Sequence, residues 1–118
     1  MKRRFRLTRS TDFKRVRRIG KSYAHPLVVL VTSRNDLAQV RIGIVAGRAL
    51  GNAVERNRAK RRLRACLEPQ LTQLTDGWDL VFLARKPMDQ ADFGEICIAV
   101  QLVLKRAGLL HERQATGP

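Results

Sequence analysis

The chain has 118 residues, of which 44% are hydrophobic and 5% aromatic, and its formal net charge is +14. This length fits one domain, residues 1–118, and the apolar fraction excludes a disordered tail. The charge predicts a polyanionic partner, a nucleic acid rather than an anionic membrane, and the few aromatic residues argue against a surface that holds bases mainly by stacking.

The N-terminal part is expected to form a basic arm followed by a short helix. Residues 1–9 are basic and have little periodicity, which predicts an extended arm whose order before binding is open. Ser10-Thr11-Asp12 offers a helix N-cap and an acid in the first turn, so we expect a helix to about Arg18 that ends at Gly20.

Two strands are expected next. Residues 27–32 form an uninterrupted β-branched and aliphatic run, which predicts a strand buried on both faces. Residues 40–46 predict a second strand that makes a hairpin with the first. Tyr23, before them, has two open roles: it stacks on RNA or supports an edge strand.

The second half of the chain predicts two helices around one strand. Asn52 and Glu55 form a capping-box pattern before a helix that ends near residue 69, and residues 78–84 predict a strand. Asp92 and Glu95 repeat the pattern before a helix that ends at Gly108. We predict an α+β fold, a small mixed sheet with three helices in the order α-β-β-β-α-β-α, with a tail at 109–118. This order contains one strand more, before the second helix, than the runs named above.

The cysteines and the hydropathy pattern exclude other classes of protein. Cys66 and Cys97 lack metal-ligand spacing and are expected to be buried free thiols, so no metal site is predicted. The charged N-terminus does not resemble a signal peptide, and no apolar run approaches the ~20 residues that span a bilayer. We therefore expect a cytoplasmic protein, monomeric when free.

Charge is concentrated in the first half of the chain. Residues 1–64 hold 19 Lys and Arg but three acids, whereas residues 65–118 hold five and seven. Six of the nine residues at 56–64 are cationic and none is acidic, so phosphates are the natural partners of this helix, although a solvated basic face is the alternative. The preceding segment, 47–53, either holds a phosphate on helix N-terminal amides or only reverses the chain.

The same segment carries a family resemblance. Arg56-Asn57-Arg58 matches the RNR motif of the bacterial ribonuclease P protein component, and the surrounding residues 50–64 are similar to the signature of that family. Further similarity lies at Gly43-Ile44, at Arg6-Leu7 with Asp12-Phe13, and at 83–87, so the resemblance extends from about residue 5 to 108.

The resemblance implies a protein subunit of the ribonucleoprotein that removes the 5′ leader from precursor tRNA. The catalytic centre and its Mg²⁺ ions would lie in a partner RNA, and the protein would carry no catalytic residue, metal or cofactor of its own. The implied fold is similar to the second domain of a small-subunit ribosomal protein, with a left-handed strand–helix–strand crossover in place of the usual right-handed one.

The resemblance also implies two sets of site residues. Phe13, Arg17, Val31 and Arg85 match positions of a leader-binding cleft, although Arg17 and Val31 stand where aromatic residues occur in the family. Phe13 is expected to be partly core as well as a base stacker. The positions implied to contact the catalytic RNA are Arg48, Asn52, Arg56, Asn57, Arg58, Lys60, Arg61, Arg62 and Arg64.

Two other functions are alternatives to this one. A protein nuclease that acts alone would need clustered carboxylates, and the basic half offers only Asp12, Asp36 and Glu55, the last of them in a helix cap. A ribosomal or DNA-binding structural protein fits the charge equally well, and only the motif resemblance argues against it.

Overall fold

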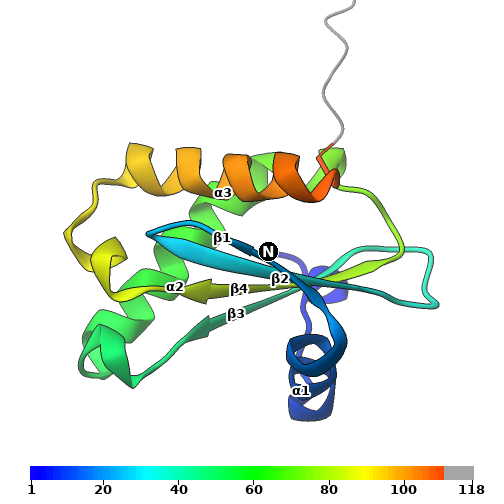
Figure 1. Ribbon diagram of the computed structural model, residues 1–118, viewed down its shortest axis with the longest axis horizontal. Coiled ribbons are helices and arrows are strands. Elements are labelled where there is room, and N and C mark those ends of the chain that lie inside the picture. The colour runs from blue at the N-terminus through cyan, green and yellow to red at the C-terminus, as the bar shows by residue number, and fades with distance from the viewer. Residues whose placement is uncertain (111–118) are drawn as a thin grey trace, which may run out of the picture.

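The computed structural model describes residues 1–110, and most of the expected C-terminal tail lies outside the described residues. The order α-β-β-β-α-β-α is confirmed (Figure 1). The helices are α1 (Ser10–Ile19), α2 (Ala53–Leu67) and α3 (Phe93–Ala107), and the strands are β1 (Lys21–Ala24), β2 (Val28–Arg34), β3 (Arg41–Ala46) and β4 (Trp78–Ala84).

The sheet has the strand order β1-β2-β4-β3, so the predicted hairpin of residues 27–32 with 40–46 is wrong. The apolar strand β4 inserts between β2 and β3, antiparallel to β2 and parallel to β3. Buried on both faces, β4 gains more from the centre of the sheet than from its edge. The hairpin lies one strand earlier, between β1 and β2, and Tyr23 belongs to its edge strand.

Helices cover both faces of the sheet and create two apolar cores. The helices α2 and α3 cover one face, where Leu30 and Phe82 of the sheet pack with Leu63 of α2 and Leu104 of α3. The helix α1 lies on the other face (Figure 1), where Val16 is fully buried. The sheet therefore separates the basic helix α2 from the short helix α1.

Local signals set the ends of the two long helices as expected. Asn52 accepts from the backbone N–H of Glu55 at 3.0 Å, and the Glu55 carboxylate accepts from the backbone N–H of Asn52 at 3.0 Å. Asp92 and Glu95 repeat the box at 2.8 and 3.1 Å. The helix α3 ends at Gly108, whose φ of 72° is left-handed.

Close backbone contact explains why α1 ends at Gly20. A Cβ at this position would lie 2.4 Å from the Val16 carbonyl oxygen and 2.7 Å from that of Thr32. Only glycine lets the turn from α1 into β1 pass so close to β2. At its other end, α1 has Arg9 in the N-cap position, so the cap does not come from the segment Ser10-Thr11-Asp12 as expected.

The N-terminal residues lie against β3. The backbone N–H of Leu7 donates to the Ile42 carbonyl at 2.8 Å, and the Leu7 side chain is buried. Arg6 forms a parallel bridge with Ile42, so residues 6 and 7 continue the sheet for one step beyond β3.

The expectation of free thiols is wrong in this structure. Cys66 of α2 and Cys97 of α3 form a disulfide with a Cα–Cα distance of 5.1 Å. Both cysteines belong to the core between α2 and α3, where the apolar faces of the two helices meet, and this brings the two sulfur atoms together. The pairing ties the basic helix to α3.

Candidate nucleic-acid interface

The helix α2 buries one stripe and presents cations around the rest of its surface. Ala59, Leu63, Cys66 and Leu67 are buried, and helical spacing places them on one face. The side chains of Asn57, Arg58 and Arg61 are exposed, and those of Arg56, Lys60, Arg62 and Arg64 are half-buried. We call these seven residues the α2 surface.

The cations of the α2 surface have few partners in the protein. Within residues 1–110, Arg58 is the one cation of the set in an ion pair, and its Nη1 lies 4.0 Å from Oδ1 of Asp89. Arg62 Nη2 donates to the carbonyl of Ala91 at 2.5 Å. Arg62 therefore holds the segment before α3, a structural contact that the sequence did not indicate.

The start of α2 places Arg48 and Asn52 near the same end of the helix. Arg48 is exposed in the short 3₁₀ turn Arg48–Leu50, and Asn52 is exposed at the N-cap. The Asn52 side-chain oxygen accepts the cap bond, and its NH₂ group can donate to an RNA phosphate.

The ring of Phe13 on α1 lies against Gly43 of β3. A Cβ at Gly43 would meet two ring carbons of Phe13 at 2.3 and 2.5 Å, so the ring uses the space that glycine leaves. The same half-buried ring lines a cavity of about 290 Å³ whose wall includes Leu7 and Ile44, with Arg6 and Arg64 also lining it. An apolar surface flanked by two guanidinium groups suits a nucleobase and its phosphate.

An apolar row of the sheet continues beyond α1. Val29, Leu83 and Val45 are partners in register across β2, β4 and β3, and all three are half-buried. The next row, which contains Val31 and Val81, is buried with the α1 side chain Val16. On this face of the sheet, α1 therefore covers the row of Val31 and Val81 completely, and the neighbouring row of Val29, Leu83 and Val45 stays partly open.

The structure separates the predicted leader residues. Arg17 is exposed one helical turn after Phe13, on the same flank of α1. Arg85 is exposed just after β4, with Nη1 3.4 Å from the His25 carbonyl. Val31 is 4% exposed and packs in the core under α1, so its side chain supports that helix and has no surface to offer a ligand.

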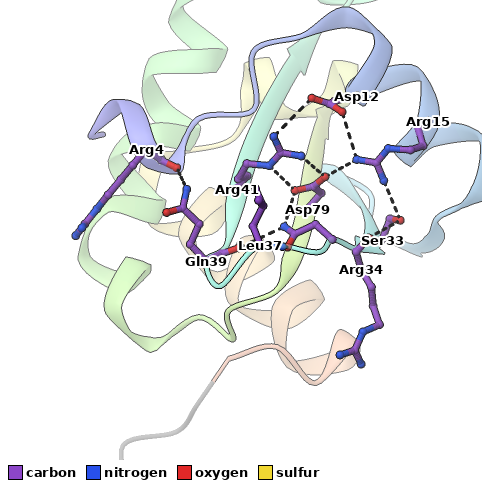
Figure 2. A network of polar contacts seen from close by, with 10 residues as sticks. Arg4, Asp12, Arg15, Ser33, Arg34, Leu37, Gln39, Arg41 and Asp79 are labelled. Atoms are coloured by element: carbon purple, nitrogen blue, oxygen red, sulfur yellow. Dashed lines mark hydrogen bonds and ion pairs between the residues drawn. The ribbon is translucent and has the colours of Figure 1, made fainter.

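A polar network under α1 was not predicted from the sequence (Figure 2). Asp79 of β4 is fully buried and accepts two bonds from Arg41, at 2.9 and 2.8 Å, and one from Arg15, at 2.6 Å. Asn35 donates to the same carboxylate at 2.8 Å. A lone acid inside the apolar run 78–84 is the signal that could have indicated it.

The partners of Asp79 keep it ionised. Burial by itself would raise the pKa of Asp79, but the hydrogen bonds from Arg41, Asn35 and Arg15 outweigh burial and hold that pKa below its usual value. The hydrogen bond to Asp79 in turn raises the pKa of Arg41. Asp79 and Arg41 therefore form an ion pair at neutral pH.

The described part of the chain lacks two features, a cluster of metal ligands and a membrane-spanning helix. Residues 1–110 contain no group of three or more His, Cys, Asp and Glu side chains that could hold a metal ion. Among the same residues, no helix is both long and apolar enough to cross a membrane.

Known proteins are similar to this chain over nearly its full length. The family model described as Ribonuclease P matches residues 1–108. The ribonuclease P protein component of Herpetosiphon aurantiacus is 40% identical over 114 residues, which are 97% of this chain and 93% of the relative. That of Clostridium novyi is 36% identical over 94% of this chain and 100% of the relative.

Solved structures share the fold. The RNase P protein of Staphylococcus aureus aligns with a TM-score of 0.83 and 30% identity, over 91% of this chain and 98% of that one. The Thermotoga maritima protein aligns with a TM-score of 0.78 and 30% identity, over 86% and 96%. A Staphylococcus aureus mutant described as defective in mRNA degradation activity aligns with a TM-score of 0.84 and 29% identity, over 91% of each chain.

Proposed function

This chain belongs to the ribonuclease P protein family, and we propose that its two faces bind two RNAs within that ribonucleoprotein. As the protein subunit of ribonuclease P, it serves 5′ maturation of tRNA. The α2 surface, with Arg48 and Asn52, binds the catalytic RNA. The opposite face, with Phe13, Arg17 and Arg85, binds the 5′ leader of precursor tRNA in the cytoplasm.

One observation carries this proposal: within residues 1–110, the cations of the α2 surface have few partners, which are Asp89 for Arg58 and the Ala91 carbonyl for Arg62. Six cations in nine residues repel one another along the helix, and among the described residues only Asp89 offers one of them a carboxylate. A polyphosphate backbone removes this repulsion and releases counterions, so binding there is favourable without any base contact. Five of the six cations are Arg, which bind phosphate in a bidentate manner.

The leader site follows from the Phe13 ring and the apolar row beside it. A single-stranded leader exposes unpaired bases, which stack on aromatic rings and on guanidinium planes. Phe13 and Arg17 supply one of each on the same flank of α1. Val31, buried beneath α1, takes part only by supporting that helix.

We assign the Mg²⁺ ions of the reaction to the catalytic RNA. The described side chains do not fit a metal centre, because no three of their carboxylates, imidazoles and cysteine sulfur atoms lie close enough together to hold one ion. The protein is therefore expected to leave precursor tRNA intact at any Mg²⁺ concentration when the catalytic RNA is absent. Cleavage of labelled precursor by protein freed of RNA and contaminating nucleases would overturn this assignment.

A second candidate function is degradation of mRNA, which the description of the Staphylococcus aureus mutant favours. The same RNA-free protein is tested on an unstructured mRNA fragment. Loss of the full-length fragment supports this second activity if the degradation rate of each column fraction is proportional to the amount of this protein in it. An intact fragment contradicts it and leaves the subunit role unchanged.

Phe13→Ala tests the leader site. We expect the holoenzyme to keep its affinity for mature tRNA and to bind precursor tRNA more weakly by about 1–3 kcal/mol, the usual value of one base stack. Phe13→Leu is the matched variant, because it keeps an apolar side chain over Gly43 without an aromatic ring. Both variants are first checked by thermal melting. If folded Phe13→Leu protein distinguishes precursor from mature tRNA as well as the parent does, Phe13 is only a core residue.

A further inference from the structure

The helix α1 is tied to the sheet by polar contacts on one flank. Arg15 Nη2 lies 2.6 Å from Oδ2 of Asp79 on β4, and Arg15 Nη1 lies 3.5 Å from Oγ of Ser33 on β2. Asp12, one turn earlier, lies 3.6 Å from Nη1 of Arg41 on β3. Two α1 side chains thus reach all three strands beneath the helix (Figure 2).

The predicted leader residues occupy the other flank of the same helix. At about 100° per residue, Phe13 and Arg17 are about 40° apart, whereas Arg15 is about 160° from each of them. Val16 lies between the flanks and is fully buried against the sheet. Rolling α1 about Val16 therefore moves Arg15 and Phe13 in opposite senses relative to the sheet.

The contacts of Phe13 are apolar, with the backbone of Gly43 and with the cluster that contains Leu7 and Val16. Apolar packing is not directional, so these contacts define the roll less sharply than hydrogen bonds do. Arg15, in contrast, bonds a carboxylate that is itself fixed in place by three other bonds, two from Arg41 and one from Asn35. The bond from Arg15 to Asp79 is therefore the contact that fixes the roll angle of α1.

We propose that Arg15, through its bond to Asp79, is a positioning residue that sets the roll of α1 and thereby places Phe13 for the leader. The inference rests on the leader site proposed above. Arg15 acts through Phe13 and does not bind RNA itself.

A double-mutant cycle tests this, with the holoenzyme reconstituted from the full chain and the catalytic RNA. The quantity measured is the ratio of the dissociation constants for mature and precursor tRNA. We expect Arg15→Ala to lower this ratio about 3- to 10-fold in the parent and to have no effect in Phe13→Ala, because the group that it positions is then absent. Affinity for the catalytic RNA is expected to stay unchanged.

Two matched variants separate positioning from charge and from stability. Arg18→Ala removes the same charge from an exposed site of α1 and is expected to leave the ratio unchanged. Arg15→Lys keeps a cation that can reach Asp79, and is expected to restore the ratio at least halfway to the parent value. If Arg15→Ala does not melt cooperatively, Arg15→Gln replaces it in the cycle, because glutamine keeps part of the side chain and removes the charge that pairs with Asp79.

The outcomes distinguish this inference from the proposed function. If Phe13→Ala leaves the ratio unchanged, the leader site is wrong and the inference falls with it. If Phe13→Ala lowers the ratio but Arg15→Ala lowers it equally in both backgrounds, Arg15 contacts RNA directly and only the positioning role is overturned. The positioning role is also overturned if Arg18→Ala lowers the ratio as much as Arg15→Ala does, because the loss of one positive charge from α1 would then explain both effects.

Discussion

Replacing Asp79 with Ala is expected to lower the free energy of unfolding by about 3–5 kcal/mol, the usual cost of removing one partner from a buried ion pair. The loss is large because two cations and an amide donate to this one carboxylate. With the carboxylate gone, Arg41 and Arg15 would stay half-buried without their main acceptor. Urea unfolding followed by circular dichroism measures the change.

The Asp79→Asn variant shows how much of this stability depends on charge, and gives it a pH signature. Because the pKa of Asp79 is lowered in the folded state, its contribution is complete above the unfolded pKa of about 3.9 and is lost as the pH falls toward the folded value. The stability difference between parent and Asp79→Asn should therefore shrink below about pH 4. A difference that is constant from pH 6 to pH 3 would show that the charge of Asp79 is not stabilising.

Local signals predicted the helices of this fold well, and the partners of the strands poorly. The capping boxes at Asn52 and Asp92 depend on residues three positions apart, so the sequence displays them directly. Strand pairing joins Val28 to Ala84 and Ala46 to Ala84, and only the complete fold decides that β4 separates β2 from β3. The hairpin prediction failed because nearness in sequence was its only basis.

The candidate site also has features that the local sequence predicts and features that only the complete fold determines. The cations of α2 follow from composition and helical spacing, but the bond of Arg62 to Ala91 depends on where the segment before α3 passes. The burial of Val31 depends on α1 lying over β2. The Cys66–Cys97 pairing requires α2 and α3 to pack side by side, and no local pattern carries that information.

The second large effect is expected from removing three cations of the α2 surface together. Arg58, Lys60 and Arg61 are chosen because Arg62 also bonds Ala91 and Arg64 also lines the Phe13 cavity. At about 1 kcal/mol for each phosphate contact, the triple alanine variant should bind the catalytic RNA about 100-fold more weakly. The slope of log K against log salt should fall in magnitude by about two, since each lost contact contributes about 0.7–0.9.

A charge-matched triple variant is the control. Lys14, Arg18 and Lys21 are exposed cations on α1 and β1, so their replacement by Ala lowers the net charge equally without touching α2. If binding depended only on total charge, both triple variants would lose the same affinity and the α2 surface would have no special role. Under the present assignment the control stays within about threefold of the parent, because it loses long-range attraction, which salt screens, and no phosphate contact. Filter binding from low to physiological salt measures both the affinity and the slope.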